Sequence, residues 1–110
     1  LHYPLRRQRQ MCIRDRVYED GGFFVDHADD SILVGGEWVR NQPERELVSL
    51  LYLNGGFNGG ELFFPQHDLM VTPAPGRIVL FPGTPQYVHR VERVVGGPRV
   101  AISQWHQIIQ

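Results

Sequence analysis

From residue 17 onward, short runs of β-branched and aromatic residues alternate with turns rich in glycine, proline and asparagine. This alternation predicts strands rather than helices. We expect eight strands, over residues 23–27, 31–34, 47–53, 61–64, 68–71, 77–81, 87–94 and 99–106. The Gly-Gly and Pro-Gly pairs between them supply the backbone angles that tight turns need. The pattern predicts an all-β domain of two packed antiparallel sheets, with a cleft between them that suits a small molecule or a metal.

Composition narrows the protein class. The chain has 110 residues, which allows one small domain, and its 12 glycines and 8 prolines argue against a helical bundle. No apolar run approaches the roughly 20 residues that cross a bilayer, and no secretory pattern is present. We therefore expect no membrane partner, and a cytoplasmic rather than a secreted location. The only cysteine, Cys12, excludes a disulfide within the chain and argues against a cysteine-based metal site.

Charge separates residues 1–16 from the rest. These residues hold five arginines and one acid, whereas residues 17–110 hold six arginines and eleven acids. The leader has no strand or helix periodicity, and its string RRQRQMCIRDR resembles translated sequencing adapter. We expect a basic leader over residues 1–16 that is non-native or disordered, a core domain over residues 17–110, and a truncated N-terminal part. The near-zero net charge of −1 argues against a nucleic-acid partner, and the oligomeric state stays open.

One short motif indicates metal chemistry. In His27-Ala28-Asp29, an imidazole and a carboxylate lie two residues apart, so an extended backbone points both to the same side. His89, in the predicted strand 87–94, is a candidate third donor that an antiparallel sandwich can bring close. Two histidines and one carboxylate leave coordination positions open, which suits Fe(II) in oxygenases. The alternative for His27 and Asp29 is a solvated turn.

A longer ordered pattern surrounds these ligands. It comprises Tyr18-x-x-Gly21-x-x-Phe24-x-x-His27-x-Asp29, Leu50-Leu51-Tyr52-Leu53-Asn54, Gly59-Gly60-Glu61-Leu62-x-Phe64-Pro65, Pro75-Gly76-Arg77-Ile78-Val79-Leu80-Phe81, His89-Arg90-Val91, Arg99 and Trp105. In this order, residues 18–106 resemble the prolyl 4-hydroxylase-like branch of the Fe(II)- and 2-oxoglutarate-dependent dioxygenases. The resemblance implies a double-stranded β-helix, which is a jelly-roll, cupin-like core. It also implies that His27, Asp29 and His89 are the catalytic iron ligands.

The resemblance further implies a reaction. Fe(II) would act with 2-oxoglutarate and dioxygen as cosubstrates, and with ascorbate as a reductant. A peptidyl, prolyl-like or small-molecule substrate would be hydroxylated while succinate and carbon dioxide are released. Related halogenases have a small residue in place of the carboxylate, so the presence of Asp29 favours hydroxylation.

Arg99 has the chemistry to bind the far carboxylate of 2-oxoglutarate, because a guanidinium offers a bidentate fork. Strand alternation places Arg99, Ala101, Ser103 and Trp105 on one face. The pattern alone leaves Arg90 and Arg93 as rivals, and the resemblance favours Arg99. The resemblance also assigns four further residues to the cosubstrate pocket, with simple core packing as the alternative for the two tyrosines: Tyr52, Tyr18, Leu62 and Trp105.

The remaining candidates are weaker. We expect His67, His106 and His2 not to bind the metal, and we note Phe24 where many relatives have tyrosine. Residues 30–45, which include Trp38, are expected to select the substrate. Two rival interpretations stay open: a cupin-like metal-binding module without oxygenase activity, and an inactive truncated relative.

Overall fold

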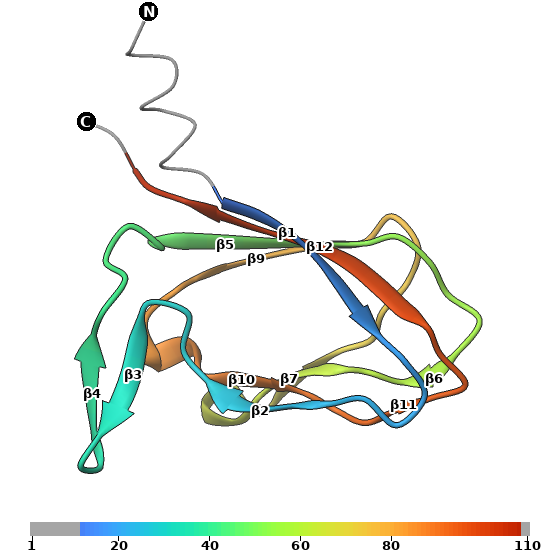
Figure 1. Cartoon of the computed structure of the whole chain (residues 1–110), viewed down its shortest axis with the longest axis horizontal. Coiled ribbons are helices and arrows are strands. Elements are labelled where there is room, and N and C mark those ends of the chain that lie inside the picture. The colour runs from blue at the N-terminus through green and yellow to red at the C-terminus, as the bar shows by residue number, and fades with distance from the viewer. Residues whose placement is uncertain (1–11, 109–110) are drawn as a thin grey trace, which may run out of the picture.

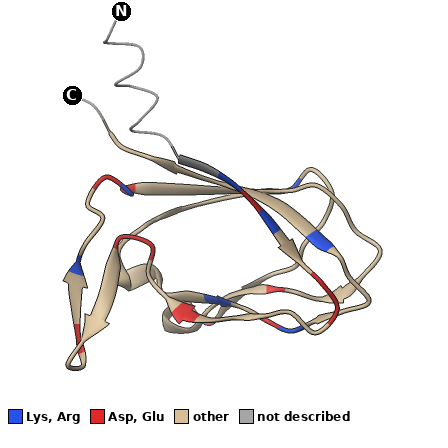
Figure 2. Cartoon of the chain, in the orientation of Figure 1, with Lys and Arg blue, Asp and Glu red and all other residues tan. Residues whose placement is uncertain are grey.

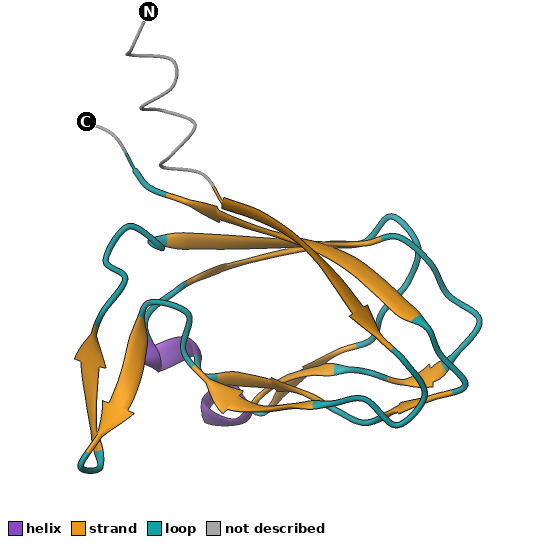
Figure 3. Ribbon diagram, in the orientation of Figure 1, coloured by secondary structure: helices purple, strands orange, loops and turns teal. Residues whose placement is uncertain are grey.

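The computed structural model describes residues 12–108, which form short strands joined by turns, with two single-turn 3₁₀ helices (Figures 1 and 3). In chain order the elements are β1 (Cys12–Tyr18), β2 (Phe24–His27), β3 (Ser31–Val34), β4 (Glu37–Arg40), β5 (Leu47–Tyr52), β6 (Asn58–Gly59), β7 (Leu62–Phe64), η1 (Pro65–His67), β8 (Leu69–Val71), β9 (Ile78–Pro82), η2 (Pro85–Tyr87), β10 (His89–Val91), β11 (Val94–Val95) and β12 (Arg99–His106).

Two four-stranded antiparallel sheets make up the body of the molecule. Their strand orders are β1-β12-β5-β9 and β2-β10-β7-β8, and Figure 1 shows the first sheet lying across the second. Strands β6 and β11 form a small pair, and the β3–β4 hairpin projects from one end of the sandwich. The predicted all-β jelly-roll fold is confirmed.

Each of the eight predicted runs contains a strand, but three strands were not predicted. These are β1, β4 and β6. Gly35 and Gly36 both have positive φ angles, 58° and 83°, which is the geometry of a tight hairpin turn. The two glycines therefore join β3 to β4, whose charged ends conceal its strand character in the sequence. The predicted run 87–94 begins late, because η2 includes Tyr87, and Glu92 and Arg93 divide it into β10 and the first residue of β11.

The first described strand crosses the predicted domain boundary at residue 17. Strand β1 pairs with β12 along its whole length, from Cys12 opposite Trp105 to Tyr18 opposite Arg99. Residues 12–16 are therefore the first part of an edge strand of the main sheet, although the sequence shows no strand periodicity there. Residues 1–11 lie outside the described residues, and a non-native leader stays a prediction.

The core lies between the two sheets and follows the alternation of their strands. Along β12 every second residue is buried, namely Arg99, Ala101, Ser103 and Trp105, as the sequence predicted. Ala101 and Trp105 join an apolar cluster that takes members from both sheets: Val48, Leu50, Tyr52, Leu62, Phe64, Phe81, Val91, Ala101 and Trp105. The buried face of β12 therefore places one arginine and one tryptophan inside the sandwich.

Charged residues are interspersed along the strands rather than gathered on one element (Figure 2). On β1, for example, Asp15 lies between Arg14 and Arg16. Within residues 12–108, no helix has the length and apolar character that a membrane span requires.

Replacing Gly83 tests the close packing that joins the end of β9 to the start of β5. Gly83 donates to the carbonyl of Glu46 at 3.1 Å and accepts from the amide of Asp30 at 2.9 Å. A Cβ atom at this position would overlap the carbonyl oxygen of Arg45, which is part of the backbone. We expect Gly83→Ala to lower the free energy of unfolding by about 1–3 kcal/mol, measured by urea denaturation.

The matched control is Gly35→Asn, because a Cβ at Gly35 meets open space and asparagine tolerates the left-handed backbone there. We expect this control to stay within about 0.5 kcal/mol of the wild type. Equal free energies of unfolding for Gly83→Ala and the control would show that the end of β9 can move away from the start of β5 without loss of stability.

Candidate metal centre

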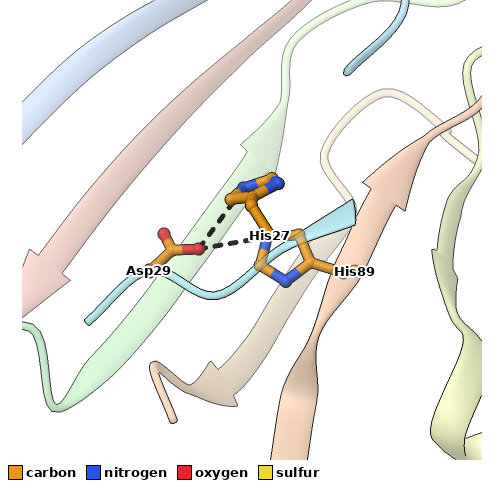
Figure 4. Close-up of side chains that lie close together, drawn as sticks. All are labelled: His27, Asp29 and His89. Atoms are coloured by element: carbon orange, nitrogen blue, oxygen red, sulfur yellow. Dashed lines mark ion pairs between the residues drawn. The ribbon is translucent and has the colours of Figure 1, made fainter. Parts of the chain in front are cut away.

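Three potential metal ligands meet between β2 and β10. His27 ends β2, His89 begins β10, and the antiparallel pairing of these strands sets the two histidines directly opposite each other. Asp29 follows two residues after His27, and its Oδ1 lies 3.6 Å from His27 Nε2 and 3.1 Å from His89 Nε2 (Figure 4). One ligand atom from each of these residues lies within 4.8 Å of the others. The strand pairing thus brings together the three residues that the sequence singled out.

The hydrogen bonds of the histidines define which nitrogen faces the centre. His27 Nδ1 lies 2.9 Å from the carbonyl oxygen of Val25, and His89 Nδ1 lies 2.9 Å from that of Tyr87. A carbonyl oxygen only accepts, so each Nδ1 donates, and each Nε2 of a neutral ring presents a lone pair. Asp29 Oδ1 is buried and accepts no hydrogen bond. Three electron-pair donors therefore converge without a proton between them, an arrangement that a divalent cation fits.

Protonation favours the same conclusion. Burial lowers the pKa of His27 below its ordinary value, and the neighbouring His89 lowers it further. Burial acts to raise the pKa of Asp29, but the charge that His89 carries when protonated and the Trp105 indole N–H outweigh it and hold the pKa below its usual range. A neutral imidazole and an ionised carboxylate are the forms that coordinate metals.

The second carboxylate oxygen of Asp29 is fixed by the protein. Trp105 Nε1 donates to Asp29 Oδ2 at 2.5 Å. The guanidinium of Arg45 lies 4.3 Å from the centre of the Trp105 ring, and its Nη1 donates to the Asp29 backbone carbonyl at 3.4 Å. Trp105 therefore supports the metal centre, and its ring also lines the cavity to which the resemblance assigned it. Nothing in the local sequence around Arg45 indicated its contact with this centre.

Arg99 lies at another part of the interior and has no carboxylate partner. Arg99 is 1% exposed, and it takes part in no ion pair within residues 12–108. Arg99 Nε donates to the Gly60 carbonyl at 2.9 Å, and Nη2 donates to the Tyr52 hydroxyl at 3.4 Å. These bonds use only two of the five N–H donors of a guanidinium. A buried cation in this state is costly unless an anion binds it.

Aromatic rings and a glycine shape the space around Arg99. The guanidinium carbon lies 5.1 Å from the ring centre of Tyr18 and 5.0 Å from that of Tyr52. Burial raises the pKa of Tyr52, so its hydroxyl stays protonated and can donate to an anion. Gly60 has a φ of 70°, and a Cβ there would lie 2.8 Å from Arg99 Cδ. Only glycine allows this close approach. The sequence shows the Gly59-Gly60 pair but not the contact with Arg99 that requires a glycine.

The metal ligands and Arg99 line one cavity. Its wall includes Phe24 and seven of the eight predicted site residues: Tyr18, His27, Asp29, Leu62, His89, Arg99 and Trp105. Tyr52 is absent from this wall and contacts the site through its bond to Arg99. A ligand in the cavity can therefore meet cationic charge at one end and a metal at the other.

The rival basic residues and the other histidines have other partners. Arg90 lies 2.7 Å from Glu92 and 3.6 Å from Asp26, and Arg93 donates to the Gly21 carbonyl at 2.8 Å. Of the three candidate arginines, only Arg99 is buried.

His67 Nε2 lies 3.0 Å from the Gln86 carbonyl, and His106 Nε2 lies 3.0 Å from Ser49 Oγ. Neither histidine belongs to the cluster of potential metal ligands within residues 12–108. His2 lies outside the described residues.

Comparison with known proteins gives consistent results. Residues 15–107 match the model of the 2OG-Fe(II) oxygenase superfamily. The chain is 39% identical over 90 residues to prolyl 3-hydroxylase 3 of Mus musculus, covering 73% of this chain and 12% of that protein. It is 33% identical over 103 residues to a PKHD-type hydroxylase of Crocosphaera subtropica, covering 89% of this chain and 44% of that protein.

Among solved structures, the viral collagen prolyl hydroxylase of Paramecium Bursaria Chlorella virus-1 superimposes with a TM-score of 0.68. Its sequence is 17% identical, and the match covers 99% of this chain and 68% of that chain. At this identity the likeness concerns the fold. The chain spans less than half the length of the two named relatives.

Removing the indole N–H tests its role at the centre. Trp105→Phe keeps an aromatic ring in the core but leaves Asp29 Oδ2 without its donor. We expect the affinity for Co(II), measured by visible absorption of the metal-loaded protein, to fall by about tenfold or more. Trp38→Phe is the matched control, because Trp38 lies on the hairpin strand β4, and we expect it to bind Co(II) as the wild type does. Unchanged affinity in folded Trp105→Phe would contradict this role.

Proposed function

Because the chain belongs to the 2OG-Fe(II) oxygenase superfamily, we propose that this domain is an Fe(II)- and 2-oxoglutarate-dependent hydroxylase. In the reaction, one atom of dioxygen enters succinate and the other becomes the hydroxyl group of the product, while 2-oxoglutarate loses carbon dioxide. Bound Fe(II) supplies the redox chemistry of this exchange. The protein residues bind the reactants, orient them and exclude water.

The observation that supports the proposal most strongly is that one cavity contains a buried cation and a buried carboxylate oxygen that both lack a partner. Arg99 is a buried cation without an anion, and Asp29 Oδ1 is a buried acceptor without a donor. A metal ion held by Asp29 satisfies the acceptor, and a dicarboxylate with an adjacent keto group can chelate that metal at one end and accept from the Arg99 guanidinium at the other. A cupin-like module that only binds metal has no need for the buried arginine.

Individual residues have distinct tasks in this proposal. His27, Asp29 and His89 hold Fe(II), and Arg99 binds the far carboxylate of 2-oxoglutarate. The Tyr52 hydroxyl, 3.4 Å from Arg99 Nη2, can donate to the same carboxylate. Leu62 is 2% exposed and keeps that end of the cavity apolar. Water exclusion strengthens the charge interaction, because screening is weak in an apolar interior.

The substrate approaches, in this proposal, through a second cavity beside the centre. This cavity has a volume of about 170 Å³, and its wall includes His27, Asp29, Ile32, Gln42 and Arg45. Apolar, amide and guanidinium groups together suit a peptidyl or small-molecule substrate. The named relatives are prolyl hydroxylases and a PKHD-type hydroxylase, which favours the peptidyl class. Ascorbate as reductant stays a prediction.

Anaerobic absorption spectroscopy tests metal and cosubstrate together. We expect a visible metal-to-ligand charge-transfer band when Fe(II) and then 2-oxoglutarate are added to the purified chain. His89→Ala should abolish the band, because a ligand is lost. Arg99→Ala should retain it but require at least about 30-fold more 2-oxoglutarate, since truncating one partner of a buried charge pair costs about 2–5 kcal/mol.

Arg93→Ala is the matched control, because Arg93 contacts Gly21 and Phe23 on the surface rather than the cavity. It should titrate as the wild type does. A folded chain that gives no band would overturn the proposal in favour of an inactive relative. Metal binding without conversion of 2-oxoglutarate to succinate in air would favour the cupin-like module.

A further inference from the structure

The side-chain amide of Asn54 bonds to the backbone on both sides of Arg99. Asn54 lies just after β5 and is half-buried. Its Nδ2 donates to the Pro98 carbonyl at 2.8 Å, and its Oδ1 accepts from the Val100 amide at 2.8 Å. The amide orientation is fixed, because a carbonyl can only accept and a backbone N–H can only donate.

These bonds continue the sheet beyond the point where the strand pairing ends. The register between β5 and β12 ends with Tyr52 opposite Ala101, and the Leu53 amide then donates to the Val100 carbonyl at 2.9 Å. The next polar groups of β12 on this side belong to Val100 and Pro98. A side-chain amide offers one donor and one acceptor, as a peptide unit does. Asn54 therefore makes the hydrogen bonds that a continuation of β5 would have made.

The segment before Arg99 is the turn Gly96-Gly97-Pro98, in which Gly96 has a φ of 74°. Its two glycines and its proline have no side-chain donors or acceptors of their own. The Gly96 amide donates to Asp20 Oδ1 at 2.8 Å, which holds the far end of the turn but not the residues next to Arg99. On the opposite side, β1 pairs with Arg99 and Val100 through Tyr18 and Val17. Asn54 is therefore the side-chain contact that holds both neighbours of Arg99 from the β5 side.

Backbone position matters at Arg99 because its guanidinium must meet a carboxylate in a fixed plane. A bidentate pair depends on both N–H groups being aligned, and supporting residues must hold such groups to within about 0.5 Å. The Gly60 carbonyl and Tyr52 hydroxyl restrain the guanidinium end, and Asn54 restrains the other end of the same side chain at its Cα.

We propose that Asn54 is a positioning residue for 2-oxoglutarate, which it serves by fixing the backbone of Arg99 without touching the cosubstrate or the metal ligands. This inference rests on the proposed function of the domain. It assigns a role to a residue that the sequence indicated only as the last member of the motif Leu50-Leu51-Tyr52-Leu53-Asn54. The expected signature is weaker binding of 2-oxoglutarate with unchanged binding of the metal.

The test compares Asn54→Ala and the isosteric Asn54→Asp with the wild type. We expect Asn54→Ala to raise the dissociation constant for 2-oxoglutarate about tenfold, which is the scale of losing two modest hydrogen bonds. The Co(II) affinity should stay within about twofold, a split that general destabilisation would not produce. Asn54→Asp should weaken the binding of 2-oxoglutarate at least as much, because it places an acceptor opposite the Pro98 carbonyl oxygen while keeping the side-chain volume.

Asn58→Ala is the matched control, since Asn58 is an exposed asparagine on β6. It should bind both ligands as the wild type does. Unchanged 2-oxoglutarate affinity in folded Asn54→Ala and Asn54→Asp, or equal loss of Co(II) and 2-oxoglutarate, would overturn the proposal.

A second readout needs neither metal nor cosubstrate. Hydrogen exchange of the Arg99 Nε–H, followed by NMR in the metal-free protein and assigned through Arg99→Lys, reports how firmly this group is held against Gly60. We expect about tenfold faster exchange in Asn54→Ala than in Asn58→Ala. Equal exchange in the two variants would overturn the role of Asn54. Failure of the wild type to bind 2-oxoglutarate, with the exchange difference present, would instead refute the proposed function.

Discussion

The unpaired guanidinium of Arg99 is the constraint on which the arrangement of the main sheet depends. A buried cation must be solvated by the protein itself, and the two tyrosine rings and the Gly60 carbonyl do this. Tyr18 lies directly opposite Arg99 on β1, and Tyr52 lies opposite Ala101 on β5. Because β12 lies between β1 and β5, it has both tyrosines on the strands beside it. The same order places Trp105, on the same face of β12, beside Asp29.

Much of this arrangement is encoded locally and was predictable. The eight predicted runs contain strands because period-two patterning depends on the immediate neighbours of each residue. The buried face of β12 follows from the same rule. The grouping of His27, Asp29 and His89 was also expected, because an H-x-D motif on an extended segment needs only one antiparallel neighbour to receive a third ligand.

The features that could not be predicted depend on contacts between distant segments. Arg45 contacts Trp105 and Asp29 only because the chain after the β3–β4 hairpin returns beside them. Strand alternation alone left Arg90 and Arg93 as rivals of Arg99, because only the packing of the two sheets shows which arginine is buried. Strand β1 has no apolar alternation, and its position follows from the free edge of β12. Local patterning contains none of this information.

The histidine hydrogen bonds have a consequence for how such a centre can arise. Each Nδ1 bonds to the carbonyl two residues earlier on its own chain segment, Val25 for His27 and Tyr87 for His89. The hydrogen bond that orients each imidazole thus lies within a three-residue segment, while Phe64 and Phe81 from other strands pack against the His89 ring. Each imidazole can therefore be transplanted onto another antiparallel ladder together with the carbonyl group that orients it. The new protein would have to supply the ring packing and a hydrogen-bond donor for the second carboxylate oxygen, the part that Trp105 plays here.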